Sequence, residues 1–329
     1  ETPSPTGDTE YAVSLIEGEL IAMGMSGSRT RKGALVARLE GFQRDRPRAL
    51  VVHVDTLGAI VSRVKPSGRL GLSALNGLIW ATVESEGVTI ATSGGRQVRG
   101  SLVLANGSGH VNSAARDGKR DDTTMEVRLD ERTSTAEETR LLGVEVGDFI
   151  YFDPRVEVSD SGYIRSRFLD NKAGVACLVA AVKALKEVDL TPAQDVTLLF
   201  GVHEEVGHGV FEVMPSDLAE LVVVDMGCIG EGLNGSETTC SLCVKDAAGP
   251  YSRGLIGKLA GIADRRGIEL ARDVYPFYSS DGSAYWRAGG GSEVALIGPG
   301  VDTSHGYERT HIDALVDTAQ LIAEYLIED

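Results

Sequence analysis

Two adjacent glutamates, Glu204 and Glu205, follow the apolar run of residues 196–202. An apolar run of this length is typical of a buried strand in a parallel sheet. Ligands of such sheets bind beyond the carboxyl ends of the strands. Two neighbouring carboxylates beside a buried strand are costly unless a cation or a proton lies between them. The pair therefore predicts that the rest of the chain supplies a cation at this place.

Further residues of metal-binding type stand where other apolar runs end or where a helix starts. They are His53 and Asp55 after residues 50–52, Asp170 at a helix start, Asp225 after residues 221–224, and His305 and His311 in a loop after the last strand. A parallel sheet brings such strand ends together. Two histidines and three to four carboxylates exceed the needs of one ion. They match two divalent cations about 3.5–4 Å apart, with one carboxylate between them.

Each of these residues alone has an ordinary structural interpretation. Asp170 could be a helix N-cap, Asp225 could simply end a strand, and a single histidine is commonly a packed or surface side chain. The spacing of His53 and Asp55 is more specific, because residues two apart share one face of a strand. Asp55 could then accept the second imidazole N–H and fix the tautomer that a metal requires. Five such strand ends together favour a metal site over coincidence.

The elements that position these residues alternate between strands and helices on both sides of a β-rich middle segment. We expect strands at 34–39, 47–55, 196–202, 221–225 and 293–297, and helices at 8–24, 171–186, 252–266, 281–288 and 312–327. This alternation predicts an α/β fold with a mixed, largely parallel sheet flanked by helices.

The middle segment, residues 63–162, has a different pattern of short strands separated by turn-rich and charged pieces. The expected strands are 79–83, 88–92, 98–104, 124–129 and 146–152. Short strands with frequent turns predict a small β-barrel. The predicted domains are therefore an α/β domain of residues 1–62 and 163–329 and an inserted β-rich domain of residues 63–162.

Composition restricts the class of protein further. The 329 residues are 42% hydrophobic, enough for two domains with full cores. The formal charge of -16 disfavours nucleic acid and membranes as partners and is compatible with a cytoplasmic enzyme. The sequence contains no apolar stretch of membrane-spanning length and no signal-peptide pattern at its start.

The Cys240-x-x-Cys243 pair has redox or zinc spacing, but we expect ordinary reduced thiols.

Five segments resemble the metal motifs of a known peptidase family. They read His53-Val-Asp-Thr-Leu-Gly-Ala-Ile-Val, Leu169-Asp-Asn-Lys-Ala-Gly, Glu204-Glu-Val-Gly, Asp225 and the His305 loop. In order and spacing they resemble the tetrahedral (TET-type) aminopeptidases, dinuclear zinc metallopeptidases that include glutamyl and deblocking aminopeptidases and members once labelled endoglucanases. Similar segments at 3–7, 147–154, 245–250 and 280–284 extend the resemblance over nearly the whole chain.

The resemblance implies a role for each motif residue. One metal would be held by His53, Asp170 and Asp225, and the other by Asp170, Glu205 and His305, with Asp170 bridging. Glu204 would be the general base, and Asp55 would orient His53. Two such ions lower the pKa of a water between them, and Glu204 would pass its proton to the leaving amine. The donor set accepts zinc, cobalt or manganese.

The last motif departs from the family pattern. The family usually has a glutamate four residues after the histidine, whereas here His305-Gly-Tyr-Glu308 is one residue shorter. We favour His305 over His311 as the ligand, because the final helix then keeps its register. Asp281, His203 and His311 are candidates for the substrate cleft, although a helix cap for Asp281 and a supporting or surface role for His203 explain them as well.

The predicted function is a cytoplasmic aminopeptidase that acts on peptides with a free N-terminus. By resemblance, a PDZ-like insertion would join dimers into a tetrahedral homododecamer. Two alternatives remain open: a related amidohydrolase, such as a deacylase or carboxypeptidase, and a metal-binding assembly protein without turnover. An unliganded Glu204 beside the metals argues against the second. A glucanase is a weak option, because glycosidases need two carboxylates flanking a sugar instead of a shared metal set.

Overall fold

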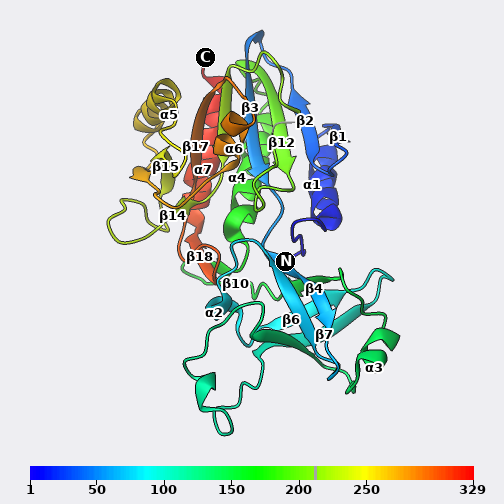
Figure 1. Ribbon diagram of the computed structural model, residues 1–329. Helices are drawn as coiled ribbons and strands as arrows, with labels where there is room; N and C mark the ends of the chain where they lie inside the picture. Colours follow the sequence, from blue (N-terminus) through cyan, green and yellow to red (C-terminus); the bar gives the residue numbers. More distant parts are fainter. Residues whose placement is uncertain (211–212) are drawn as a thin grey trace. The chain divides into compact units, whose positions relative to one another are not determined.

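The computed structural model describes residues 1–210 and 213–329, which form two compact units (Figure 1). The larger unit contains Glu1–Thr56 and Val156–Asp329, and the smaller contains Leu57–Arg155. In these described residues, no helix combines the length and the apolar character that a membrane span needs.

The larger unit is built on a nine-stranded sheet. Its strands are β1 (Gly27–Arg29), β2 (Leu35–Leu39), β3 (Gln43–His53), β12 (Gln194–Gly201), β13 (Glu220–Val224), β14 (Gly227–Cys228), β15 (Cys240–Lys245), β16 (Leu270–Val274) and β17 (Glu293–Val301). Their order is β1-β2-β12-β3-β13-β17-β15-β16, with β14 beside β17. The central strands β12, β3, β13 and β17 are parallel, and their apolar runs are buried because helices cover both faces.

Helices flank this sheet on its two faces. They are α1 (Glu10–Ala22), α4 (Leu169–Glu187), α5 (Arg253–Arg266), α6 (Asp281–Arg287) and α7 (Ile312–Ile327). Side chains alternate along β13. On one face of β13, a Cβ at Gly282 of α6 would lie 3.2 Å from Val223. Glu220 stands three residues before Val223 in the same strand and so lies on the other face, where Tyr325 of α7 donates a hydrogen bond to it at 2.8 Å. Helices α6 and α7 therefore cover opposite faces (Figure 1). A small sheet of β10 (Glu157–Val158), β11 (Tyr163–Ser166) and β18 (Glu308–His311) completes the unit.

The smaller unit is a closed antiparallel barrel with the strand order β4-β5-β8-β7-β6-β9. The strands are β4 (Gly58–Val64), β5 (Leu70–Leu75), β6 (Gly87–Ala91), β7 (Gln97–Leu104), β8 (Met125–Leu129) and β9 (Phe149–Phe152), and the helical pieces are α2 (Trp80–Val83), η1 (Ser113–Ala115) and α3 (Ala136–Leu141). Burial alternates along β6 and β7, as the period of a strand requires. The predicted mixed α/β fold with a small β-barrel is confirmed.

One predicted strand of the insertion is wrong. Residues 79–83 were expected to be a strand, but Trp80–Val83 forms the short helix α2. The run follows a turn at Asn76 and Gly77, both with positive φ, and only Val83 of the helix is buried. A short apolar run does not show the periodicity that distinguishes a strand from a helix. The strands β4 and β5 were not predicted.

Strand register aligns the places where three central strands end. His53, the last residue of β3, pairs with Gly201, the last residue of β12. On the other side of β3, Val51 pairs with Val223 of β13. The segments that follow β3, β12 and β13 therefore leave the sheet at one edge, the position at which open α/β sheets bind ligands.

Candidate metal centre

The structure brings the five predicted metal ligands together at this edge in two groups. His53, Asp170 and Asp225 form one group, and Asp170, Glu205 and His305 form the other. In each group the potential ligand atoms lie within 4.8 Å of one another. Asp170 belongs to both groups.

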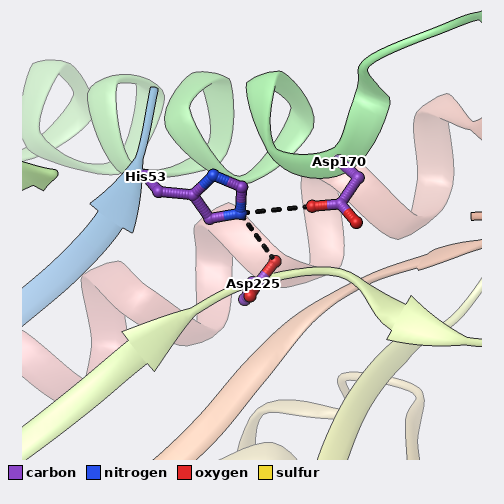
Figure 2. A group of neighbouring side chains, drawn as sticks. All are labelled: His53, Asp170 and Asp225. Atoms are coloured by element: carbon purple, nitrogen blue, oxygen red, sulfur yellow. Dashed lines mark ion pairs between the residues drawn. The ribbon is translucent and has the colours of Figure 1, made fainter. Parts of the chain in front are cut away.

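The first group is buried and centred on an imidazole nitrogen (Figure 2). His53 Nε2 lies 3.2 Å from Asp170 Oδ1 and 3.6 Å from Asp225 Oδ1. His53 ends β3, Asp225 follows β13 directly, and Asp170 is the second residue of α4. Ligand atoms about 2.0–2.2 Å from one shared ion lie roughly 3–4 Å apart. These separations therefore fit a bound divalent cation.

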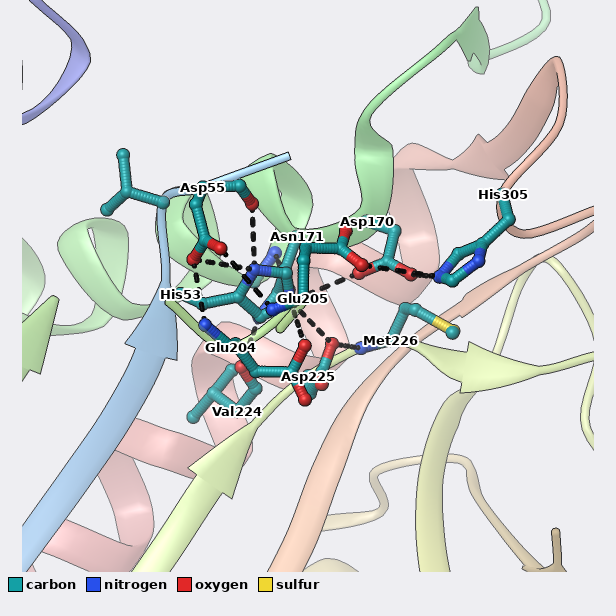
Figure 3. Close-up of polar contacts among 12 residues, drawn as sticks. His53, Asp55, Asp170, Asn171, Glu204, Glu205, Val224, Asp225, Met226 and His305 are labelled. Atoms are coloured by element: carbon teal, nitrogen blue, oxygen red, sulfur yellow. Dashed lines mark hydrogen bonds and ion pairs between the residues drawn. The ribbon is translucent and has the colours of Figure 1, made fainter. Parts of the chain in front are cut away.

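The second group lies on the other side of the Asp170 carboxylate. His305 Nε2 is 3.5 Å from Asp170 Oδ2 and 3.6 Å from Glu205 Oε2. His305 comes from the turn between β17 and β18, and Glu205 from the turn after β12. The two oxygens of Asp170 thus face two different histidines (Figure 3). This is the arrangement of a carboxylate that bridges two ions.

The tautomer of His53 is set by a backbone group. Its Nδ1 lies 2.9 Å from the carbonyl oxygen of Asp55, and a carbonyl oxygen can only accept a hydrogen bond. Nδ1 therefore carries the proton, which leaves the lone pair of Nε2 for a metal. The sequence-based expectation that the Asp55 carboxylate accepts this N–H is wrong in detail, because the nearest carboxylate oxygen is 3.7 Å away.

The Asp55 carboxylate instead holds the turn that carries the two glutamates. It accepts hydrogen bonds from the backbone N–H groups of Glu204, at 3.1 Å, and Glu205, at 3.3 Å (Figure 3). The hydroxyl of Thr6 donates a third, at 2.7 Å. Asp55 is fully buried, so this carboxylate can adjust little and fixes the backbone of both glutamates.

Hydrogen bonds also fix the residues around Asp225. One carboxylate oxygen accepts the backbone N–H of Met226 at 2.7 Å, and the other accepts the hydroxyl of Tyr278 at 2.5 Å. Asn171, next to Asp170, donates from its side chain to the carbonyl of Val224 at 2.8 Å. This bond ties the start of α4 to the end of β13, and so brings Asp170 and Asp225 together.

Glu308 is a supporting residue to which the sequence assigned no role. Its carboxylate accepts the backbone N–H groups of Asp170 and His305, each at 3.0 Å. It thereby joins the two segments that supply the second group. The signal in the sequence was its position three residues after His305.

Burial and neighbouring carboxylates raise the pKa values of the two glutamates, Glu204 and Glu205. Burial raises the pKa of Glu204 well above its usual range, and the nearby Asp225, Asp281 and Asp170 raise it further, against an opposing effect of His53. Burial and the charge of Asp170 likewise raise the pKa of Glu205 well above its usual range. A divalent cation in each group would offset this repulsion. Imidazole nitrogen and carboxylate oxygen are ligands that suit zinc, cobalt and manganese.

The remaining predicted site residues lie outside both groups. His311 caps α7 through Asp313 and lies 2.7 Å from the carbonyl of Ser161. His203 stacks on His208 with ring centroids 5.0 Å apart, and burial lowers its pKa. Asp281 is the buried first residue of α6. It belongs to neither ligand group, although its charge contributes to the raised pKa of Glu204.

The sequence profile of the M42 glutamyl aminopeptidase family matches residues 33–321. The chain belongs to this family. YhfE of Bacillus subtilis (strain 168), named as a candidate aminopeptidase, is 40% identical over 324 residues, which cover 98% of this chain and 94% of YhfE. The predicted relation to the TET-type aminopeptidases is confirmed, and membership of a peptidase family supports a peptide hydrolase activity.

Solved structures share the fold over the whole chain. The TET aminopeptidase from the marine sediment archaeon Thaumarchaeota archaeon SCGC AB-539-E09 has a TM-score of 0.89 at 18% identity, covering 100% of this chain and 94% of that chain. The TET1 peptidase of Pyrococcus horikoshii, described as assembling into a tetrahedron or a large octahedral shell, has a TM-score of 0.84 at 21% identity, covering 100% and 97%. At these identities the likeness establishes the fold alone.

Proposed function

We propose that the protein is a metal-dependent aminopeptidase that removes N-terminal residues from peptides by means of two divalent ions. The observation that carries the proposal is the position of Asp170, whose two carboxylate oxygens face His53 and His305 at 3.2 and 3.5 Å. A carboxylate that binds a single ion would face one histidine, whereas each oxygen of Asp170 faces a different histidine.

The ligands of the first ion would be His53, Asp170 and Asp225, and those of the second Asp170, Glu205 and His305. Zinc is the ion that we expect, with cobalt or manganese as substitutes. When bound, two such ions supply an acidic water, polarise the scissile carbonyl and hold the free α-amine of the substrate.

Glu204 would act as the general base. It belongs to neither ligand group, yet its Oε2 lies 3.9 Å from His53 Nε2 and its side chain is largely buried. A base works best when its pKa lies near the working pH, and burial shifts the pKa of this carboxyl upward in that direction. Glu204 would accept the proton of the attacking water and give it to the leaving amine. Asp55 would hold the backbone of Glu204 in place during both transfers.

We also propose a cytoplasmic location and an assembly of identical subunits. The relatives support the assembly, because the Pyrococcus horikoshii TET1 peptidase is described as forming a tetrahedron. The inserted β-rich domain, predicted at residues 63–162, carries none of the metal-binding residues. Assembly through dimers into a homododecamer is its proposed role.

The proposal is tested with matched peptides after loading the protein with zinc, cobalt or manganese. Leucine p-nitroanilide and a free tripeptide should be cleaved, and N-acetylation of the tripeptide should abolish its cleavage. Equal cleavage of the acetylated peptide would instead assign a related amidohydrolase. Two bound ions with no turnover on any substrate would assign a metal-binding assembly protein.

A further inference from the structure

A cavity of about 700 Å³ lies beside the turn that carries Glu204. Its charged or ionisable lining residues are Lys32, His208 and Arg287, and its other described lining residues are glycine, alanine and valine. In the described part of the chain, no carboxylate lines this cavity. The lining is unusual in a protein with a formal charge of -16.

Three separate segments supply these side chains. Lys32 comes from the turn between β1 and β2, His208 from the segment after β12, and Arg287 from the last position of α6. The Lys32 ammonium donates to the carbonyl of His208 at 3.2 Å and lies 3.3 Å from its Nδ1. A lysine ammonium can only donate, so the carbonyl of His208 accepts this hydrogen bond. Lys32 thereby holds the cavity wall in place.

The two permanent cations have no carboxylate partner within the described residues. Neither Lys32 nor Arg287 forms an ion pair there, and the guanidinium of Arg287 donates a 3.4 Å hydrogen bond to the hydroxyl of Ser279. One buried acid, Asp281, packs behind Gly209, where an added Cβ would lie 2.8 Å from its carboxylate. The described lining of the cavity therefore offers positively charged groups and no carboxylate to an anion.

Part of the cavity wall belongs to the segment that carries the proposed general base. The N–H of Gly207 donates to the carbonyl of Glu204 at 2.7 Å, and the N–H of His208 donates to the carbonyl of His203 at 3.1 Å. A base that gives its proton to the leaving amine must face the leaving part of the peptide. Residues 207–210 line the cavity, and Gly207 is bonded to the backbone of Glu204 within one turn.

We propose that this cavity binds a carboxylate carried by the leaving part of the peptide. The inference rests on the proposed aminopeptidase function and names its substrate class, short peptides with an anionic group close to the scissile bond. The carboxylate can come from two sources. One is the free C-terminus of a dipeptide, and the other is an acidic side chain at the second residue.

The test compares kcat/KM for substrate pairs that differ only in this charge. Leu-Gly is compared with Leu-Gly-amide for the C-terminal source, and Leu-Glu-amide with Leu-Gln-amide for the side-chain source. The charged member of at least one pair should be preferred roughly tenfold, the effect of one exposed charge-assisted hydrogen bond. The pair that shows the preference identifies the source.

The double variant K32M/R287M should bring that preference to about one. The matched control is K186M/R253M, which removes the same charge at two exposed positions that do not line the cavity; it should keep the wild-type preference. R287K, which keeps the charge, should retain most of it. A preference that survives in K32M/R287M, or is lost equally in the control, overturns the inference.

Leucine p-nitroanilide, which has no carboxylate, separates this inference from the proposed function. Its hydrolysis gives the basal activity of each variant, and in K32M/R287M the preferred charged substrate should lose roughly tenfold more activity than the anilide. If the anilide is cleaved but neither substrate pair shows a preference, the carboxylate site is disproved and the aminopeptidase stands. If no substrate is cleaved by the metal-loaded wild type, the proposed function itself fails.

Discussion

The carboxylate of Glu308 accepts the backbone N–H of Asp170 at 3.0 Å and, through its other oxygen, that of His305 at the same distance. Asp170 and His305 stand at the start of α4 and in the turn before β18. Glu308 thus sets the separation of two residues that face each other across 3.5 Å. It belongs to neither ligand group and contacts Asp170 and His305 through their backbone N–H groups.

Replacing Glu308 by glutamine should weaken binding of the ion proposed at His305. Glutamine keeps one acceptor oxygen and presents an N–H₂ group to the second backbone N–H, so one of the two segments is released. Loss of such support typically lowers metal affinity about 10- to 100-fold. Metal titration by calorimetry measures the effect.

Two histidine variants serve as controls in the same titration. His305→Ala should lose the second ion almost completely, and His311→Ala should bind both ions normally, because His311 only caps α7. Normal binding by Glu308→Gln, or loss of an ion in His311→Ala, would contradict this assignment.

Replacing Glu204 by glutamine should separate metal binding from turnover. The amide has nearly the same shape but cannot carry a proton, so activity should fall by roughly 10²–10⁴-fold, the usual contribution of a general base. Metal content, measured by atomic emission, should stay at the wild-type value. Loss of an ion together with activity would show that Glu204 is a ligand.

Asp55→Asn tests the control of the Glu204–Glu205 turn by a buried carboxylate. An asparagine can accept only through one oxygen, so one of the two backbone N–H groups loses its partner. Activity should fall about 100-fold, because a small displacement of a catalytic group such as Glu204 lowers the rate by about that factor. Thr6→Val is the matched control, because it removes only the hydroxyl from the same carboxylate and should cost less than tenfold. Equal losses in both variants would argue against a specific effect on the turn.

The sequence predicts which side chains lie together because it places ligand-type residues where apolar runs end. Parallel strands bring such ends to one edge, so distant residues such as His53 and Asp225 could be assigned to one site. The partner of the His53 ring could not be predicted, because it is the carbonyl of Asp55 and every residue has a carbonyl. The role of Glu308 depends on two backbone N–H groups and leaves no pattern beyond its spacing.

The insertion was harder to predict in detail than the α/β part. Its alternating strands at 88–92 and 98–104 could be predicted because one face is buried and the other is less buried. The run at 79–83 has no such alternation, and its turn at Asn76 and Gly77 starts a helix instead of a strand. The cationic cavity joins Lys32, His208 and Arg287, which lie far apart in sequence, so only the tertiary structure reveals it.

Asp281→Asn should flatten the dependence of stability on pH. Burial raises the pKa of Asp281 to about 7 in the folded protein, against about 3.9 in an unfolded chain. Between pH 4 and 7 the folded state keeps a proton that the unfolded state has lost. Stability therefore falls as the pH rises through this window, by on the order of a few kcal/mol, and the variant lacks this loss.

The measurement is urea unfolding of chelator-treated protein at pH 4.5, 6 and 7.5 (roughly the window set by the two pKa values). Asp160→Asn, at an exposed position, is the control and should follow the wild type. If wild type and Asp281→Asn lose stability in parallel across this range, the burial of a titrating Asp281 carboxyl is disproved.

Arg48 should be important for stability at the opposite end of the strands. Its guanidinium is 2% exposed, lies 3.3 Å from Glu220, and donates to the carbonyls of Tyr325 and Glu328 at 2.8 and 2.7 Å. Arg48→Met breaks this network and leaves buried polar groups behind, so it should destabilise by about 3–5 kcal/mol. Arg46 pairs with the same Glu220 at 3.3 Å but is 60% exposed, so Arg46→Met should cost less than about 1 kcal/mol. Urea unfolding followed by circular dichroism compares them, and similar midpoints for the two variants would show that burial does not set the strength of the pair.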